Sequence, residues 1–134
     1  MNRRRLLRAG VALAATAVAG CLSGGSSGPV RVSMTTEFAF DPARVTVDAG
    51  ATVTWVNDSG VAHTVTADDD TLPPGAAYFA SGGYATERAA RTDLRDGLIA
   101  PDETYAHAFE TRGTYEYVCL PHEGSGMTGS VVVR

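Results

Sequence analysis

The chain has 134 residues, 11 of them basic and 15 acidic, and a formal net charge of −4 at pH 7. All 11 basic residues are arginine and four of them lie within the first eight positions, so the rest of the chain carries seven arginines against 15 acids, a net charge of −8. This charge argues against nucleic acid as a partner, because its phosphates would be repelled. An acidic chain without lysine is typical of adaptation to high salt, where screening makes self-repulsion tolerable; a GC-rich genome would also favour arginine.

The N-terminal residues have the pattern of an exported lipoprotein signal. The four early arginines form a basic segment of twin-arginine appearance, residues 9–20 are small and apolar, and Cys21 follows. We therefore predict a signal peptide over residues 1–20 and a lipid anchor at Cys21, which would hold the protein at the outer face of the cytoplasmic membrane. A transmembrane anchor ranks second, because an apolar run of 12 residues is shorter than the roughly 20 that span a bilayer.

Short runs of alternating apolar and polar residues fill most of the remaining chain. Residues 21–29 are rich in Ser and Gly and are expected to form a flexible tether. In the first run, Val30, Val32 and Met34 alternate with polar residues, which is the pattern of a half-buried strand. Such runs, bounded by Gly, Asp and Asn turns, predict an all-β fold, an antiparallel sandwich or barrel in one domain spanning residues 30–134. The predicted strands cover residues 30–35, 45–47, 52–57, 63–66, 105–109, 114–119 and 129–133.

Residues 68–103 interrupt the strand pattern. They open with three consecutive acids at 68–70, which we interpret as a solvated loop, with docking of a partner as the alternative. Residues 86–96 predict a short helix, because Glu87 suits its first turn and Gly97 suits its end.

Four residues form the most informative pattern of the chain. Cys119, His122 and Met127 lie in one short segment between two predicted strands, and His63 lies far upstream. One thiolate, two imidazoles and one thioether form the ligand set of a blue copper electron-transfer site. A trigonal set of two nitrogens and one thiolate with a weak axial thioether favours neither oxidation state strongly, so little would rearrange when an electron moves.

The spacing of this ligand set also suits a rigid loop. Glycines at 124, 126 and 129 allow the loop to bend back, and Pro121 stiffens it and removes a backbone donor near the sulfur. Zinc binding or a purely structural Cys119 is the alternative for the site, although zinc would more often recruit a second cysteine or a carboxylate. Core packing is the alternative for Met127. A Cys21–Cys119 disulfide is disfavoured, because each cysteine already has a predicted role.

The third histidine, His107, is expected to be structural. It alternates with Tyr105 and Phe109 and so shares their face of a strand, where a hydrogen-bonded core histidine is more common than a fifth ligand. Packing, rather than a role as an electron relay, is also the interpretation of Trp55, Tyr115 and Tyr117.

The chain closely resembles the plastocyanin and amicyanin group of small blue copper proteins. The resemblance rests on GTYEYVCLPHEGSGM at residues 113–127, FDPARVTVDAG at 40–50 and VTWVN at 53–57. With the export signal, the acidity and the absence of lysine, the chain looks most like halocyanin, the membrane-tethered form of halophilic archaea. The resemblance implies a cupredoxin fold, an eight-stranded Greek-key β-sandwich, with one copper ion at one end. The ligands that it implies are His63, Cys119, His122 and Met127.

The resemblance also implies that electrons enter and leave through His122. A small apolar patch would frame this residue at the surface. Its predicted members are Val61, Ala62, Pro121, Gly124 and Gly126.

Two departures from the plastocyanin pattern stand out. Plastocyanins usually carry Asn directly after the first ligand histidine, bonded across to a Ser or Thr after the cysteine, and here these positions are Thr64 and Leu120. The usual cross-link therefore cannot form, and the reduction potential of the family does not carry over. His63 and Cys119 are also 56 positions apart, longer than is typical, and the extra length falls within residues 68–103.

These observations favour a monomeric one-electron carrier that exchanges electrons with membrane redox complexes and has no substrate turnover. A copper store is the first alternative, but such proteins prefer exposed Met- and His-rich clusters. A copper enzyme is the second, and enzymes of this class need further copper sites that three histidines do not provide.

Overall fold

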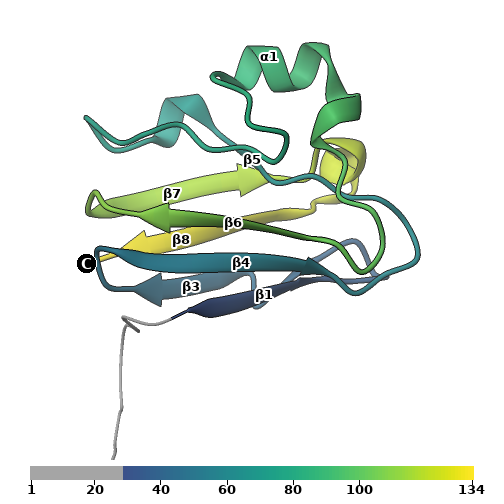
Figure 1. The fold of residues 1–134 in the computed structure, drawn as a ribbon, viewed down its shortest axis with the longest axis horizontal. Coiled ribbons are helices and arrows are strands. Elements are labelled where there is room, and N and C mark those ends of the chain that lie inside the picture. The colour runs from purple at the N-terminus through teal and green to yellow at the C-terminus, as the bar shows by residue number, and fades with distance from the viewer. Residues whose placement is uncertain (1–28) are drawn as a thin grey trace, which may run out of the picture.

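Eight strands form two sheets in the part of the chain that the structure, a computed structural model, describes, residues 29–134. The sheets have the strand orders β2-β1-β4-β6 and β3-β8-β7-β5 and pack face to face (Figure 1). This confirms the all-β sandwich, while the predicted signal peptide, Cys21 and nearly all of the tether lie outside the described residues. The strands are β1 (Val30–Met34), β2 (Phe40–Asp41), β3 (Arg44–Val47), β4 (Ala51–Asn57), β5 (Thr66–Ala67), β6 (Thr104–Phe109), β7 (Gly113–Val118) and β8 (Thr128–Val133).

Both sheets are mixed, so the expectation of a purely antiparallel sandwich was wrong. Strand β1 pairs with β4 in parallel, and β3 pairs with β8 in parallel, while the remaining pairs are antiparallel. Parallel neighbours need a crossover connection. Between β1 and β4 the chain supplies one by passing through β3 in the opposite sheet.

Alternation along the strands places the core between the sheets. In β4 every second residue is buried, and the fully buried Trp55 lies at its centre. Its ring meets Tyr117 of β7 edge-on, with ring centroids 5.2 Å apart, and Tyr115 is buried on the same face. These three aromatic residues therefore pack in the core as predicted.

The segment between β5 and β6 holds the α-helix of the described residues and two 3₁₀ turns. Helix α1 (Glu87–Thr92) confirms the predicted helix, and the Oγ1 atom of its N-cap Thr86 accepts a hydrogen bond from the amide of Ala89 at 3.1 Å. The predicted range divides at Asp93 into α1 and a 3₁₀ turn, η2 (Leu94–Gly97). Within the acidic run, the half-buried Asp68 caps another 3₁₀ turn, η1 (Asp69–Thr71), in which Asp69 and Asp70 are exposed. No helix within residues 29–134 is long and apolar enough to cross a membrane.

Three connections meet at one end of the sandwich. The β7–β8 connection contains the 3₁₀ segment η3 (Leu120–Ser125), and the β4–β5 connection contains His63. The predicted strand over 63–66 was wrong for most of its length, since His63 makes an isolated bridge with Ile99 and only Thr66 belongs to β5. The third connection, between β1 and β2, carries Phe38.

Candidate metal centre

Three of the four predicted ligands converge at this end of the sandwich. The Nδ1 atoms of His63 and His122 lie 3.2 Å apart, and Cys119 Sγ lies 3.6 Å from the first and 3.3 Å from the second. Ligands about 2.0–2.3 Å from a trigonal first-row metal lie roughly 3.5–4 Å from one another. The three donor atoms are therefore close to the separations that one shared ion requires.

The β7–β8 connection carries Cys119, His122 and Met127 as the sequence predicts. Cys119 directly follows β7, and its amide donates to the carbonyl of Met127 at 3.0 Å, which closes the loop. The Met127 amide donates to the carbonyl of His122 at 3.3 Å, and Gly126 ends η3 with a φ of 86°, a conformation that glycine adopts without strain. Met127 is fully buried beside Cys119, so it belongs to the core as well as to this loop.

A buried polar network fixes His63. Its Nε2 atom lies 2.8 Å from Ser59 Oγ, which in turn donates to Asn57 Oδ1 at 2.7 Å. A proton on Nε2 leaves the Nδ1 lone pair free and directed at the other two ligand atoms. Sequence analysis missed both supporting residues. Asn57 ends β4, and the connection that follows it carries Ser59 and His63.

Burial makes Cys119 and His63 suited to a metal. Desolvation raises the pKa of the Cys119 thiol, and desolvation followed by the neighbouring His122 lowers the pKa of His63. A buried thiolate is costly without a positive partner, whereas a neutral imidazole is the form that binds metal. The site therefore offers soft and borderline donors to a cation that carries its own compensating charge.

Comparisons with known proteins agree with this donor set. A family model described as copper binding proteins, plastocyanin/azurin family, matches residues 29–134. Plastocyanin from Scenedesmus fuscus is 42% identical over 95 residues, which cover 71% of this chain and 86% of that protein. The chain belongs to the plastocyanin/azurin family of copper-binding proteins. A chloroplastic plastocyanin from Pisum sativum is 37% identical, and the match covers 93% of this chain and 70% of that protein. Among solved structures, a pseudoazurin from Sinorhizobium matches with a TM-score of 0.59 and 26% identity, over 80% of this chain and 74% of that one.

Membership makes the chain a blue copper cupredoxin with one type 1 copper, of the electron-transfer class. Proteins of this family are electron carriers rather than enzymes. The copper site sits where the three connections meet, at one end of the β-sandwich.

The cupredoxin replaces the usual cross-link beside its cysteine with a different one. Thr64 Oγ1 accepts a hydrogen bond from the Leu120 amide at 2.9 Å, and the Thr64 amide donates to Cys119 Sγ at 3.4 Å. The two positions that depart from the plastocyanin pattern are thus still tied together, through the backbone of Leu120. The Thr64 amide also places a donor beside the sulfur, and such a bond stabilises the thiolate charge.

Phe38 covers the ring of His122, a contact that sequence analysis missed. The two rings stack with centroids 4.2 Å apart and planes 12° apart, and Phe38 remains 37% exposed. Its φ of 60° lies in the left-handed region, which costs about 1–3 kcal/mol for a non-glycine residue. The turn between β1 and β2 imposes this conformation, because the Phe38 amide bonds the Thr35 carbonyl and the Thr35 amide bonds the Ala39 carbonyl.

The predicted apolar patch is exposed around a half-buried His122. Val61 is 44% exposed, and only Ala62 among the predicted members is half-buried. Phe38, which is 37% exposed, adds an aromatic ring to this surface. The exposed members are Val61, Pro121, Gly124 and Gly126.

His107 lies apart from the metal ligands. It shares a face of β6 with Tyr105 and Phe109, as predicted, and it stacks on Phe79 with centroids 4.9 Å apart. Its contacts within the described part of the chain are with aromatic rings rather than with the hydrogen-bond partners that we expected.

Proposed function

We propose that this cupredoxin is a one-electron carrier whose copper is held by His63, Cys119, His122 and Met127. The observation that carries the proposal is the convergence of three donor atoms within 3.2–3.6 Å at the end of a rigid sandwich. Bound copper would supply the Cu(II)/Cu(I) couple. Buried Cys119 and His63 would exclude water from it, and the half-buried His122 would be its route to a partner.

Rigid support of the donors suits this role better than storage of copper. Asn57 and Ser59 hold His63, Thr64 bonds the loop beside Cys119, and Phe38 covers His122. Donors fixed before the metal binds change little between oxidation states. A copper store would instead need donors that release the metal readily.

We also propose the finer, halocyanin-like assignment. Its support is the sequence of the first 29 residues, with its basic segment, small apolar run and Cys21, together with the acidic, lysine-free remainder. The carrier would be a monomer tethered by lipid on Cys21 at the outer face of the membrane, between a donor and an acceptor complex. If Cys21→Ser leaves the protein as firmly in the membrane fraction as the unchanged chain, the lipid tether is refuted.

Titration of the protein with Cu(II), followed by visible absorption and EPR, tests the ligand assignment. One equivalent of copper should give an intense thiolate-to-copper charge-transfer band and a narrow copper hyperfine splitting, and Cys119→Ser should abolish both. The band should bleach on reduction and return on oxidation over many cycles. A colourless complex, or a blue one that cannot be cycled, would contradict the proposed electron carrier.

A further inference from the structure

Helix α1 makes a direct ionic contact with the loop of copper ligands. The guanidinium of Arg91 donates from Nη1 to Glu123 Oε1 at 2.8 Å and from Nη2 to Glu123 Oε2 at 3.0 Å. Glu123 directly follows His122 in η3. Two parallel, charge-assisted bonds of this kind fix orientation as well as distance.

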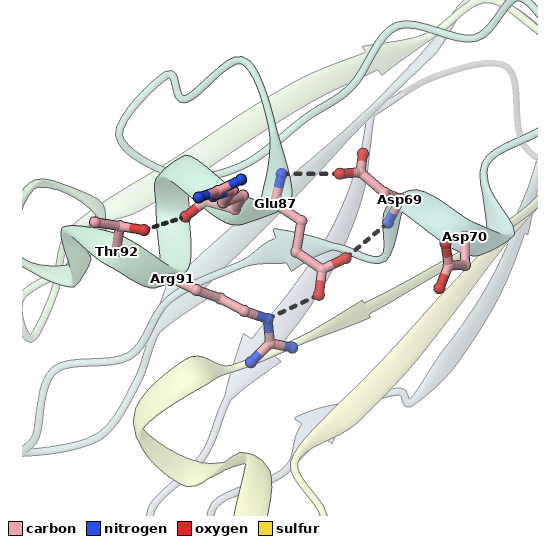
Figure 2. Close-up of a pocket in the computed structure, with 6 residues that line it drawn as sticks. Asp69, Asp70, Glu87, Arg91 and Thr92 are labelled. Carbon is pink, nitrogen blue, oxygen red and sulfur yellow. Dashed lines mark hydrogen bonds and ion pairs between the residues drawn. The ribbon is translucent and has the colours of Figure 1, made fainter.

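Glu87, on the same helix, holds the Arg91 side chain in place. The Arg91 Nε donates to Glu87 Oε2 at 2.7 Å, one helical turn earlier. Glu87 and Asp69 then bond reciprocally, since the Asp69 amide donates to Glu87 Oε1 at 2.9 Å and the Glu87 amide donates to Asp69 Oδ2 at 3.1 Å (Figure 2). Figure 2 also shows that the Arg91 side chain extends past Glu87 toward the pale yellow ribbon of η3.

The chain of contacts begins at the strand that leads to Cys119. The amide of Asp68, at the start of η1, donates to the Glu116 carbonyl of β7 at 2.9 Å, and Thr71 Oγ1 accepts from the Glu116 amide at 3.4 Å. From β7 the connection therefore runs through η1, Glu87 and Arg91 to Glu123. It links β7, which leads into the ligand loop, to Glu123 in the middle of that loop, and it passes through the segment that departs most from the family pattern.

The loop needs such an external support because packing gives it little. None of the six residues of η3 is buried. Segments with few buried contacts and exposed backbone hydrogen bonds open at low free-energy cost. His122 sits in this segment, whereas Cys119 and Met127 at its ends are fully buried.

We propose that Arg91 is a positioning residue for the copper site. With Glu87 and Glu123 it forms a brace that keeps η3 closed and holds His122 over the metal. This inference rests on the proposed ligand role of His122. The brace slows opening of the loop, and therefore slows loss of copper through it.

Two measurements on the full-length chain test the brace. The first is the rate at which reduced, copper-loaded protein transfers Cu(I) to excess bicinchoninate. The second needs no metal: hydrogen exchange at the Gly126 and Met127 amides, which close the loop. Arg91→Gln should accelerate both about fivefold, the effect of losing one well-formed surface ion pair. Arg91→Lys keeps the charge but not the paired geometry. Both of its rates should fall between those of the unchanged protein and those of Arg91→Gln.

Arg88→Gln is the matched control, because Arg88 is an exposed arginine of the same helix. It makes the same change of charge and should leave both rates unchanged. Glu123→Gln should match Arg91→Gln, and the double variant should be no faster than either, since all three break one contact. At about 1 M salt, where the Debye length falls to about 3 Å, the rates of the unchanged protein should approach those of Arg91→Gln.

The brace is refuted if Arg91→Gln behaves as Arg88→Gln does, or if the effects of Arg91→Gln and Glu123→Gln multiply in the double variant. A protein that exchanges these amides as expected but binds no copper would instead refute the proposed function and leave the brace in place.

Discussion

Asn57 is a fully buried residue that holds Ser59, the direct partner of the His63 ring. Its side-chain amide donates to the carbonyls of Val61 at 2.7 Å and Ile99 at 2.9 Å, and its Oδ1 accepts from the Ser59 amide at 2.9 Å and the Ser59 hydroxyl at 2.7 Å. Asn57→Ala removes all four bonds from a fully buried position. Its consequences should appear both in stability and in the copper spectrum.

The loss in the free energy of unfolding depends on which hydrogen bonds the partners of Asn57 still make. Each buried hydrogen bond contributes about 1 kcal/mol, and a donor left unsatisfied costs about 1–3 kcal/mol. The Val61 carbonyl can accept the freed Ser59 hydroxyl, whose Oγ lies 3.0 Å away, and the Ile99 carbonyl keeps a bond from the His63 amide at 3.2 Å. The Ser59 amide, by contrast, is left without a partner among the described residues. We expect Asn57→Ala to lower the free energy of unfolding by about 3–4 kcal/mol, or the melting temperature by roughly 15–25 °C.

Urea unfolding of the copper-free protein measures this loss, and EPR of the copper form reports the orientation of His63. Tyr115→Phe is the control, because it removes a hydrogen bond to the Thr111 carbonyl at the β6–β7 turn and should cost about 1 kcal/mol with an unchanged copper spectrum. A loss below 1 kcal/mol for Asn57→Ala, or an EPR spectrum identical to that of the unchanged protein, would refute the proposed role of the network.

Three further predictions concern other parts of the molecule. Phe38→Ala uncovers the His122 ring, so water should stabilise Cu(II) and lower the reduction potential; voltammetry that shows no shift would contradict this. Gly129→Ala places a Cβ about 2.5 Å from the Tyr117 ring and should cost about 1–3 kcal/mol in urea unfolding, whereas an unchanged midpoint would show that the buried ring moves freely. Burial lowers the pKa of His107, so the unfolded chain binds more protons below about pH 6.5. Stability should therefore fall as the pH drops through that value, and His107→Gln should flatten the fall; parallel stability curves for the two proteins would contradict it.

The ligand loop could be predicted because its determinants are local. Cys119, His122 and Met127 lie within nine residues, and the alternating runs on either side fix where the strands end. The bonds that close the loop also run between these same residues. A pattern of residue types at short spacing was therefore sufficient to place three of the four predicted ligands in one loop.

Strand pairing could not be predicted in the same way. Alternation shows which face of a strand is buried, but not which strand lies beside it. The parallel pairing of β1 with β4 depends on a crossover through the other sheet, and apolar alternation in residues 63–66 proved compatible with an isolated bridge at His63. Both outcomes are set by tertiary packing rather than by the local sequence.

The residues that support the site were also beyond the sequence pattern. Phe38 reaches His122 from a turn 84 positions away, and Arg91 reaches Glu123 from a helix 32 positions away. Neither contact produces a recognisable pattern in the sequence, because a single exposed aromatic residue or arginine is common on any surface. Only the juxtaposition of the β1–β2 turn, α1 and η3 gives these residues a role.

The three converging predicted ligands are supported to different degrees. This difference predicts the order in which they should detach from copper. His63 is fixed by a fully buried network, and Cys119 is buried between strand and loop with the Thr64 amide on its sulfur. The ring of His122 is covered on one face by the exposed Phe38 ring, and its loop is held by the Arg91–Glu123 ion pair, whose side chains are each 41% exposed. Because exposed contacts are worth less than buried ones, His122 should be the ligand that leaves first. The proposed route for electrons, His122, is thus the predicted ligand whose position depends most on the surface around it.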